Sequence, residues 1–364
     1  MVLPRRLLWL SCVATSTTAM TSRPLSTRRV WQQHSFGALT RLALETVPFD
    51  TSLQRDEVLI RVTAIGLNYA DIFTVLGLYE AAVKEKRLPF VPGLEFAGVV
   101  EESGGPLLTK GQRVYGFRRF GAFGDRIVQK AAFVRSTPDH WTDAEAASFV
   151  VQYMTAWYAL VDLGNCKKGS KVLVHSAAGG VGLAALHICN QLKAEAVAVV
   201  GNDSKVSVAR NRGGLALRKV IVRPSKTPDS AYLRSLDDCD GFDVVLDSLG
   251  ARFFDCAFDR LRPMGRIIHF GATNAYGSAR DGVFKWPSLA KAYLQRPKVD
   301  PGILTSTNRA VMGFNLIWLC DRIDDMTRCL DALITALEGA EEDLDDANGA
   351  NNGDEDNNNN NNNN

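Results

Sequence analysis

The sequence predicts an α/β protein in which a β-rich N-terminal half is followed by a half built on a doubly wound parallel sheet. Short alternating runs broken by Gly and Pro fill residues 35–140, a pattern typical of strands joined by turns. From about residue 150 to 271, strand-like and helix-like stretches alternate, which indicates βαβ units. A glycine-rich turn joins the first strand of that half to its first helix.

Length and composition allow two domains and exclude several classes of protein. The chain has 364 residues, of which 46% are hydrophobic and 23% charged, as in ordinary globular proteins. The net charge of +2 gives no sign of a nucleic-acid partner. No CxxC pair occurs among the seven cysteines, so we expect reduced thiols. No apolar run is long enough to span a bilayer.

Residues 1–34 are expected to be a targeting peptide or a disordered terminus. "MVLPRRLLWLSCVATSTTAMTSRPLSTRRVW" is rich in Arg, Ser and Thr and contains no acidic residue, which is typical of an organelle transit peptide. "LLWLSCVA" also allows a secretory signal, but the arginines after it favour an organelle address. We therefore expect a mitochondrial protein, with a cytoplasmic one as the alternative. Membrane association stays open, because no amphipathic helix outside this segment supports it.

Residues 35–150 are predicted as one domain and residues 151–316 as a second. In the first, "EVLIRVTAIGL" (57–67) and "GVVEES" (98–103) alternate as half-buried strands do. In the second, the expected strands are residues 171–175, 196–200, 219–222, 243–247 and 266–270.

The C-terminal end is predicted as a helical segment, 317–340, followed by an unfolded tail. A helix is expected near residues 321–338. "EEDLDDANGANNGDEDNNNNNNNN" (341–364) is acidic, rich in Asn and too poor in apolar residues to fold alone.

The turn "HSAAGGVG" carries Gly179, Gly180 and Gly182 between a strand and a helix. Small residues let the backbone turn tightly and approach a pyrophosphate, which the first amides of the helix then face. This context favours dinucleotide binding over a close-packed turn without a ligand.

The end of the next strand, "VVGNDSK", bears on which dinucleotide binds. Gly201 stands where NAD sites place an acidic residue. Ser204 and Lys205 follow, and they suit the 2′-phosphate of NADP(H), whereas Asp203 suits the free hydroxyl of NAD. We favour NADP(H).

A zinc site is not expected in the β-rich half. No Cys lies between residues 12 and 166, and no His between 34 and 140, so a Cys/His ligand set is missing there. His175, His187 and His269 fall in or beside predicted core elements, and we interpret them as packed, neutral imidazoles.

Together these blocks resemble the zinc-independent quinone oxidoreductases of the medium-chain dehydrogenase/reductase superfamily. The resemblance covers residues 36–316 and includes "GLNYADIFTVLGLY", "PGLEFAGVV", "KGQRVYGF", "VQYMTAWYAL", "VVLDSLG" and "LRPMGRIIHFGATN". "PKVDPGILTSTNRAVMGFNL" is most similar to the branch with the vesicle amine transport proteins. The family implies a GroES-like β domain, a Rossmann domain and a site between them; a homodimer stays open.

The resemblance also implies roles for single residues. Asn68 and Thr155 would line the nicotinamide end of the cleft, and Tyr79 would lie near the substrate. Some relatives have a second tyrosine at the position of Phe73. Glu95, in "PGLEFAG", is interpreted as structural.

The remaining implied residues contact the cofactor. Lys205 would meet the 2′-phosphate, beside Ser204, although the loop from Gly201 is two residues shorter than in relatives. For Phe314, as for Tyr79, plain apolar packing is the alternative. The other implied cofactor-binding residues are Gly179, Gly180, Val181, Arg223 and Asn315.

The family's chain returns after "GFNL" to complete the β domain, and here we expect that closing segment to be missing. We expect an NADPH-dependent reductase that passes hydride to a quinone or an α,β-unsaturated carbonyl, the small-molecule partner. The alternatives are a nucleotide-binding, vesicle-protein-like chain with little catalysis and a 2-enoyl thioester reductase. Residues 276–300 are expected to cover the substrate mouth or to be plain surface.

Overall fold

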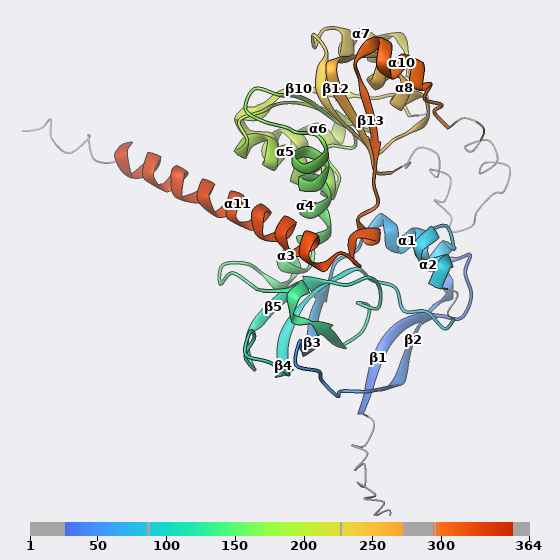
Figure 1. Ribbon diagram of the computed structural model, residues 1–364, viewed down its shortest axis with the longest axis vertical. Helices are drawn as coiled ribbons and strands as arrows, with labels where there is room; N and C mark the ends of the chain where they lie inside the picture. Colours follow the sequence, from blue (N-terminus) through green and yellow to red (C-terminus); the bar gives the residue numbers. More distant parts are fainter. Residues whose placement is uncertain (1–25, 86–87, 226–227, 272–293, 295, 352–364) are drawn as a thin grey trace, which may run out of the picture.

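The fold was analysed in a computed structural model, which describes residues 26–85, 88–225, 228–271, 294 and 296–351. Figure 1 shows an antiparallel sheet with short helices below a parallel sheet with helices on both faces. We call residues 26–149 the β domain and residues 150–313 the parallel-sheet domain. This arrangement confirms the predicted fold class. Residues 276–293, expected near a substrate mouth, lie outside the described residues.

The β domain has a five-stranded antiparallel sheet with the order β6-β3-β4-β5-β7. Val58 and Ile60 of β3 are fully buried, and they pack with Phe96 of β4 and Ile127 of β6 in one apolar core. Three helices lie at the end of the domain that faces the other half: α1 (Tyr69–Leu76), α2 (Glu80–Glu85) and α3 (Asp143–Ala147). The strands are β3 (Glu57–Ile65), β4 (Glu95–Ser103), β5 (Arg113–Phe117), β6 (Arg126–Lys130) and β7 (Val134–Ser136).

A hairpin of β1 (Ser26–Gln33) and β2 (Leu42–Phe49) flanks this sheet. The expected boundary of the N-terminal segment at residue 34 is therefore wrong, since residues 26–33 form strand β1. The reason is an alternation within "STRRVWQQ" that turns Val30 inward, where it is fully buried. Residues 1–25 lie outside the described part, so the targeting peptide stays a prediction.

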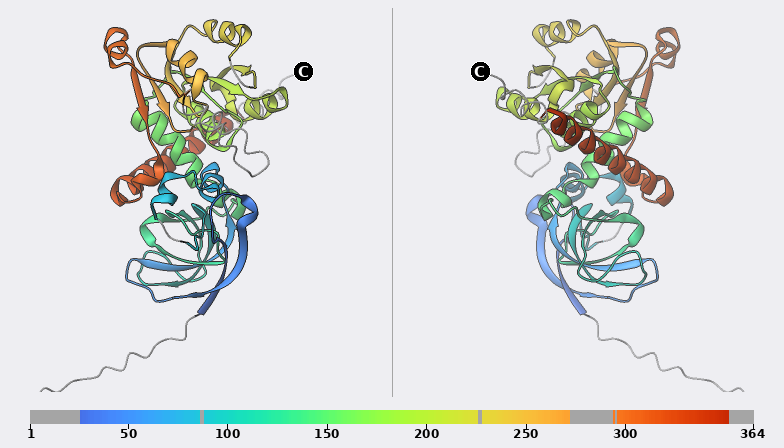
Figure 2. Two further views of the ribbon diagram at one scale, coloured as in Figure 1. Left: turned by 90° about the vertical axis from the view of Figure 1, so that its right-hand side faces the viewer. Right: turned by 90° about the vertical axis from the view of Figure 1, so that its left-hand side faces the viewer.

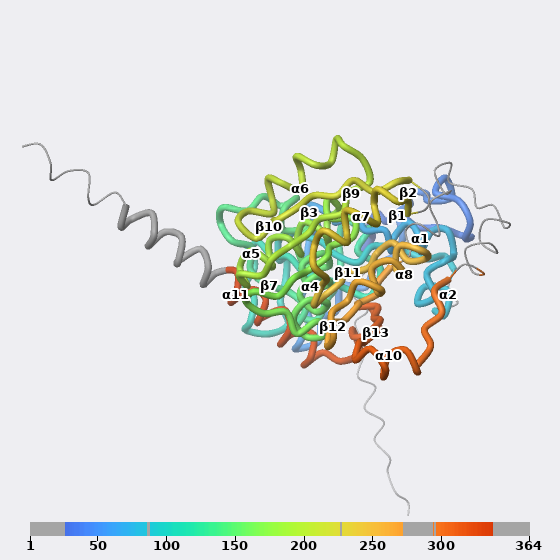
Figure 3. Tube along the Cα trace, turned by 90° about the horizontal axis from the view of Figure 1, so that it is seen from above, coloured from blue at the N-terminus to red at the C-terminus, as the bar shows by residue number. Residues whose placement is uncertain are grey.

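The parallel-sheet domain has six strands in the order β10-β9-β8-β11-β12-β13, all paired in parallel. Its margins are β10 and β13, on opposite sides in Figure 3. Each of the five expected strands is present, and β13 was missed because it is a four-residue element without a clear alternation. The strands are β8 (Lys171–Val174), β9 (Glu195–Val200), β10 (Leu217–Val222), β11 (Phe242–Asp247), β12 (Leu261–His269) and β13 (Ala310–Gly313).

Helices cover both faces of this sheet. Along β8, Val172 and Val174 pack into the core shared with α4 and α5, while Leu173 packs into the core shared with α7 and α8. Such a strand is buried on both faces, which explains its continuous apolar run. The helices are α4 (Val150–Trp157), α5 (Gly180–Gln191), α6 (Val206–Gly213), α7 (Ser230–Asp237), α8 (Ala251–Asp259) and α10 (Pro301–Thr307).

The last helix, α11 (Ile323–Asn351), returns to the junction of the two domains (Figure 2). Its side chains Met326, Leu330 and Leu333 are buried in the core shared with α4 and α5. Asp331 of α11 forms an ion pair of 2.7 Å with Arg135 of the β domain. The expected unfolded tail from residue 341 is therefore helical as far as Asn351, because extending an existing helix avoids the cost of nucleation.

A short 3-10 helix, Leu316–Leu319, carries the chain from β13 toward α11. The ring of its Trp318 lies 4.9 Å from Lys84 Nζ and 5.5 Å from the guanidinium carbon of Arg119. Both cations belong to the β domain, so these cation–π contacts hold the segment after β13 against the β domain. Among the described helices, none is long and apolar enough to cross a membrane.

Candidate functional site

The glycine turn lies between β8 and α5, at the carboxyl end of the parallel sheet. Gly179 caps α5, and Gly179 and Gly180 are exposed. A Cβ atom on Gly182 would lie 2.5 Å from the carbonyl oxygen of Ser176, so only glycine fits there. Val181 lies in the first turn of α5. The open helix N-terminus therefore presents free amides to any anion that approaches this edge.

Strand order reverses between β8 and β11, so the crevice beside this turn lies at a topological switch point. Buried Asp247, at the end of β11, accepts hydrogen bonds from His175 Nδ1 at 2.8 Å and His269 Nδ1 at 2.7 Å. Burial alone would raise the pKa of Asp247, but these two imidazoles hold it well below its ordinary range. His175 is buried as expected, whereas the side chain of His269 is 38% exposed.

Candidate phosphate-binding residues follow β9 and β10. Ser204 and Lys205 are exposed, and the Ser204 hydroxyl donates to Asn202 Oδ1 at 2.8 Å. Arg223 follows β10, and its Nη2 would lie 3.9 Å from a Cβ added to Gly201. Its guanidinium also lies 5.3 Å from the ring centre of Phe253. A cation thus lies beside the position where an NAD site would carry an acid.

The residues predicted to line the nicotinamide lie at the domain junction. Asn68 precedes α1, and its Nδ2 donates to Glu95 Oε1 at 2.9 Å. The other oxygen of Glu95 accepts from the backbone N–H of Val151 at 2.9 Å. Thr155, one helical turn further along α4, donates its hydroxyl to the Val151 carbonyl oxygen at 2.6 Å. Asn68 and Thr155 are thus linked through one buried carboxyl.

Two carboxyl groups in this region are buried, and sequence reasoning did not assign either to the site. Burial raises the pKa of Glu95 to about 7, against the hydrogen bonds from Val151 and Asn68. Burial likewise raises the pKa of Asp71, in α1, to about 6. Asp71 accepts from the backbone N–H groups of Asn68 and Gly93. The signal available in the sequence was an acid inside the apolar stretch "PGLEFAG".

Tyr79 and Asn315 meet across the junction. The Tyr79 hydroxyl donates to Asn315 Oδ1 at 2.8 Å, although 236 residues separate them. Burial raises the pKa of Tyr79 to about 12, so its hydroxyl keeps the proton at neutral pH. The Tyr79 ring packs edge-on against Phe120. Tyr79 therefore has both features: its ring packs against an apolar neighbour, and its hydroxyl is hydrogen-bonded to Asn315.

Phe314 lies directly before Asn315, at the end of β13. Its ring lies 5.1 Å from that of Tyr158 and 6.0 Å from that of Phe270. Its backbone N–H donates to the His269 carbonyl oxygen at 3.3 Å. Aromatic packing thus holds the segment from which Asn315 reaches Tyr79.

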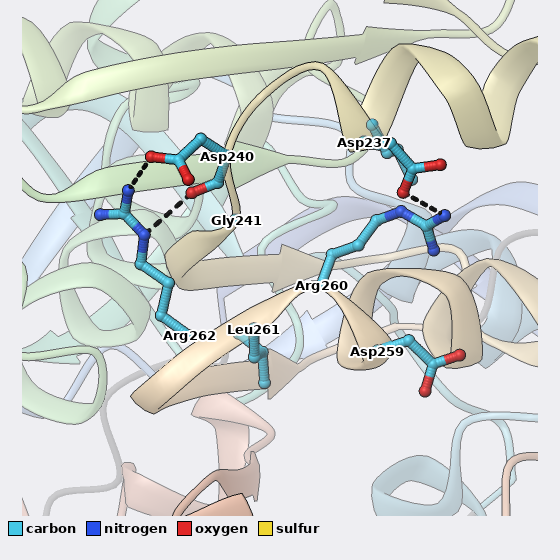
Figure 4. A pocket seen from close by; sticks show the side chains of 8 residues that line it. Asp237, Asp240, Gly241, Asp259, Arg260, Leu261 and Arg262 are labelled. Carbon is cyan, nitrogen blue, oxygen red and sulfur yellow. Dashed lines mark hydrogen bonds and ion pairs between the residues drawn. The ribbon is translucent and has the colours of Figure 1, made fainter.

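A separate cavity of about 380 Å³ opens at the amino ends of β11 and β12, and Figure 4 shows the side chains that line it. The glycine turn lies at the opposite, carboxyl end of the sheet. Arg262 pairs with Asp240 and Arg260 pairs with Asp237, each at 2.7 Å. Since these arginines already have carboxylate partners, we assign no ligand to this cavity.

Comparisons with known proteins agree with this architecture. A model described as the alcohol dehydrogenase GroES-like domain matches residues 54–141, and one described as a zinc-binding dehydrogenase matches residues 180–309. The synaptic vesicle membrane protein VAT-1 homolog of Rattus norvegicus is 30% identical over 304 residues, covering 82% of this chain and 72% of the rat protein. The chain belongs to the medium-chain dehydrogenase/reductase family. Within it, the chain groups with the quinone oxidoreductases, near the VAT-1 branch.

Other members of the medium-chain dehydrogenase/reductase family extend this result. The VAT-1 homolog of Danio rerio is 30% identical over 306 residues, and the match covers 83% of this chain and 60% of that longer protein. A mycobacterial structure complexed with NADPH has a TM-score of 0.68 and 26% identity, covering 86% of this chain and 88% of that one.

One of the two matching family descriptions names zinc. Within the described ranges, no three His, Cys, Asp or Glu side chains form a metal-binding group. Cys320, which packs in the same cluster as Tyr79, has a pKa raised to about 11 by burial. Without a bound metal this thiol is therefore protonated at neutral pH.

Proposed function

We propose that this chain is an NADPH-dependent, zinc-independent reductase that transfers hydride to a quinone or an α,β-unsaturated carbonyl compound. The observation that carries the proposal is the junction site. There Tyr79 hydrogen-bonds Asn315 and packs in one apolar cluster with Val151. The backbone of Val151 in turn binds Glu95, the partner of Asn68, and Thr155. Bound NADPH supplies the hydride. The chain spans only 60% of the zebrafish relative, so activity and substrate are inferred from its own residues.

For the cofactor, the glycine turn and the helix N-terminus of α5 would bind the pyrophosphate. Lys205 and Arg223 offer positive charge near Gly201, which suits a 2′-phosphate. A mycobacterial relative is complexed with NADPH, which supports the same cofactor here.

For the chemistry, Tyr79 holds a proton that it can pass to the reduced substrate. Hydride adds two electrons to the electrophilic carbon, and the Tyr79 hydroxyl or a water then protonates the resulting enolate or phenolate. In the structure this proton lies in the hydrogen bond to Asn315 Oδ1, so the hydroxyl would turn from Asn315 to the substrate before the transfer and would then regain a proton from solvent. The rate gain comes mainly from orientation, as in other cofactor enzymes.

The experiment is a titration of the full chain with NADPH and NADH, followed by nicotinamide fluorescence, and then turnover with a benzoquinone. We expect tight NADPH binding, weaker NADH binding and quinone-dependent oxidation of NADPH. Equal affinities would refute the NADP(H) assignment. NADPH binding without turnover of quinones or enones would refute the reductase and favour a nucleotide-binding protein with little catalysis.

A further inference from the structure

The buried carboxyl of Glu95 is shared between the two domains. Its Oε1 accepts from the Asn68 side chain, and its Oε2 accepts from the Val151 backbone, each at 2.9 Å. Asn68 begins α1 of the β domain, and Val151 lies in the first turn of α4, where the chain enters the parallel-sheet domain. Glu95 itself is fully buried at the start of β4.

The chain is folded closely around this carboxyl. A Cβ atom on Gly66 would lie 2.4 Å from Glu95 Oε1 and 2.3 Å from the Ala147 carbonyl oxygen. Only glycine therefore lets these three segments approach one another. The Gly66 N–H also donates to the Glu95 carbonyl oxygen at 3.3 Å.

Each of the two N–H donors bound to Glu95 connects it to one residue at the nicotinamide end of the proposed site. Asn68 is bound directly, and Thr155 is bound to the carbonyl of Val151, whose N–H Glu95 accepts. We propose that Glu95 is a positioning residue that aligns Asn68 and α4 for hydride transfer. This inference rests on the proposed reductase function.

The two N–H donors, Asn68 Nδ2 and the Val151 backbone, require two acceptor oxygens on one side chain. A carboxyl group offers both, whereas the amide of glutamine offers one oxygen and turns an NH₂ group toward the second donor. Asp71 is the charged neighbour that acts on Glu95, and like charge between the two carboxylates adds to burial in raising the pKa of Glu95. The deprotonated form accepts both N–H donors best.

The test compares Glu95→Gln with Glu101→Gln, a control on the same strand whose carboxylate pairs with Arg126 near the surface. For E95Q we expect kcat to fall about 10- to 100-fold, as misalignment at a reacting centre does, with the Kd for NADPH changed less than about threefold. For E101Q we expect no change in either. Thermal unfolding of both variants checks that each is folded.

Two further readouts separate positioning from mere structural support. The kcat of the wild type should rise with pH through an inflection near 7, where Glu95 loses its proton, and E95Q should lack this inflection. The loss in E95Q should also be at least about threefold smaller when Asn68 is already Ala, because the two act in series. A folded E95Q with wild-type kcat and pH profile would overturn the inference.

The failure of the proposed function looks different. If the wild type binds NADPH but reduces neither quinone nor enone, the reductase is wrong. The positioning role is then judged on the fluorescence of bound NADPH, which should change near pH 7 in the wild type and not in E95Q. If the folded wild type binds no NADPH, both proposals are overturned.

Discussion

Replacing Glu95 by Gln should change how the free energy of unfolding depends on pH. The pKa of Glu95 is raised from 4.5 to about 7 by burial, so the folded state binds this proton more tightly than the unfolded state. The contribution of Glu95 to stability is therefore fully present below pH 4.5 and is lost as the pH rises to about 7. Since each pKa unit corresponds to about 1.4 kcal/mol, the loss amounts to about 3 kcal/mol.

Glutamine does not titrate, so E95Q escapes this loss. It gives up one hydrogen bond, which costs about 1 kcal/mol at every pH. The assay is urea unfolding of wild type and E95Q, followed by tryptophan fluorescence from pH 4.5 to 8.5. We expect the wild type to lose about 3 kcal/mol relative to E95Q across this range. A difference between the two proteins that stays constant with pH would refute the reasoning.

Other predictions follow from single contacts. Tyr79→Phe should lower kcat about 100-fold without changing the Kd for NADPH; an unchanged kcat would mean that water supplies the proton. Lys205→Ala should weaken NADPH binding about tenfold and leave NADH binding unchanged, measured by fluorescence titration; parallel losses would argue against a 2′-phosphate contact. Leu333→Ala, at a fully buried position of α11, should cost about 2–5 kcal/mol in urea unfolding, and a cost near zero would mean that α11 is not part of the core. Residues 1–25 fused to a fluorescent protein should direct it to mitochondria, and a diffuse cytoplasmic signal would refute the transit peptide.

Local patterns explain which parts of the fold were readable from the sequence. The turn from β8 to α5 was predicted from its glycines between a strand and a helix, and β8 was predicted from its apolar run. The start of β1 at Ser26 was missed because its arginines resemble a targeting peptide in composition. The alternation of buried and exposed residues in this segment indicates a strand only once β2, its partner later in the chain, is known.

Long-range contacts explain what was not readable at the site. The bond between Tyr79 and Asn315 joins residues 236 positions apart, and no local pattern encodes such a distance. The resemblance suggested both residues separately, but the structure alone pairs them. Glu95 looked structural because a single acid in an apolar stretch does not show which donors it will hold.

The hydrogen bond between Tyr79 and Asn315 lies at the domain junction, apart from the glycine turn, so the proposed reaction and the proposed pyrophosphate binding take place in different parts of the molecule. The glycine turn belongs wholly to the parallel-sheet domain, so that domain can capture a cofactor without help from its neighbour. The proposed reacting end forms only where the segment after β13, which carries Asn315, contacts Tyr79 of the β domain. Relative motion of the domains would therefore leave the glycine turn intact while it forms or breaks the contact between Tyr79 and Asn315. The proposed hydride transfer would then take place only with the two domains in contact.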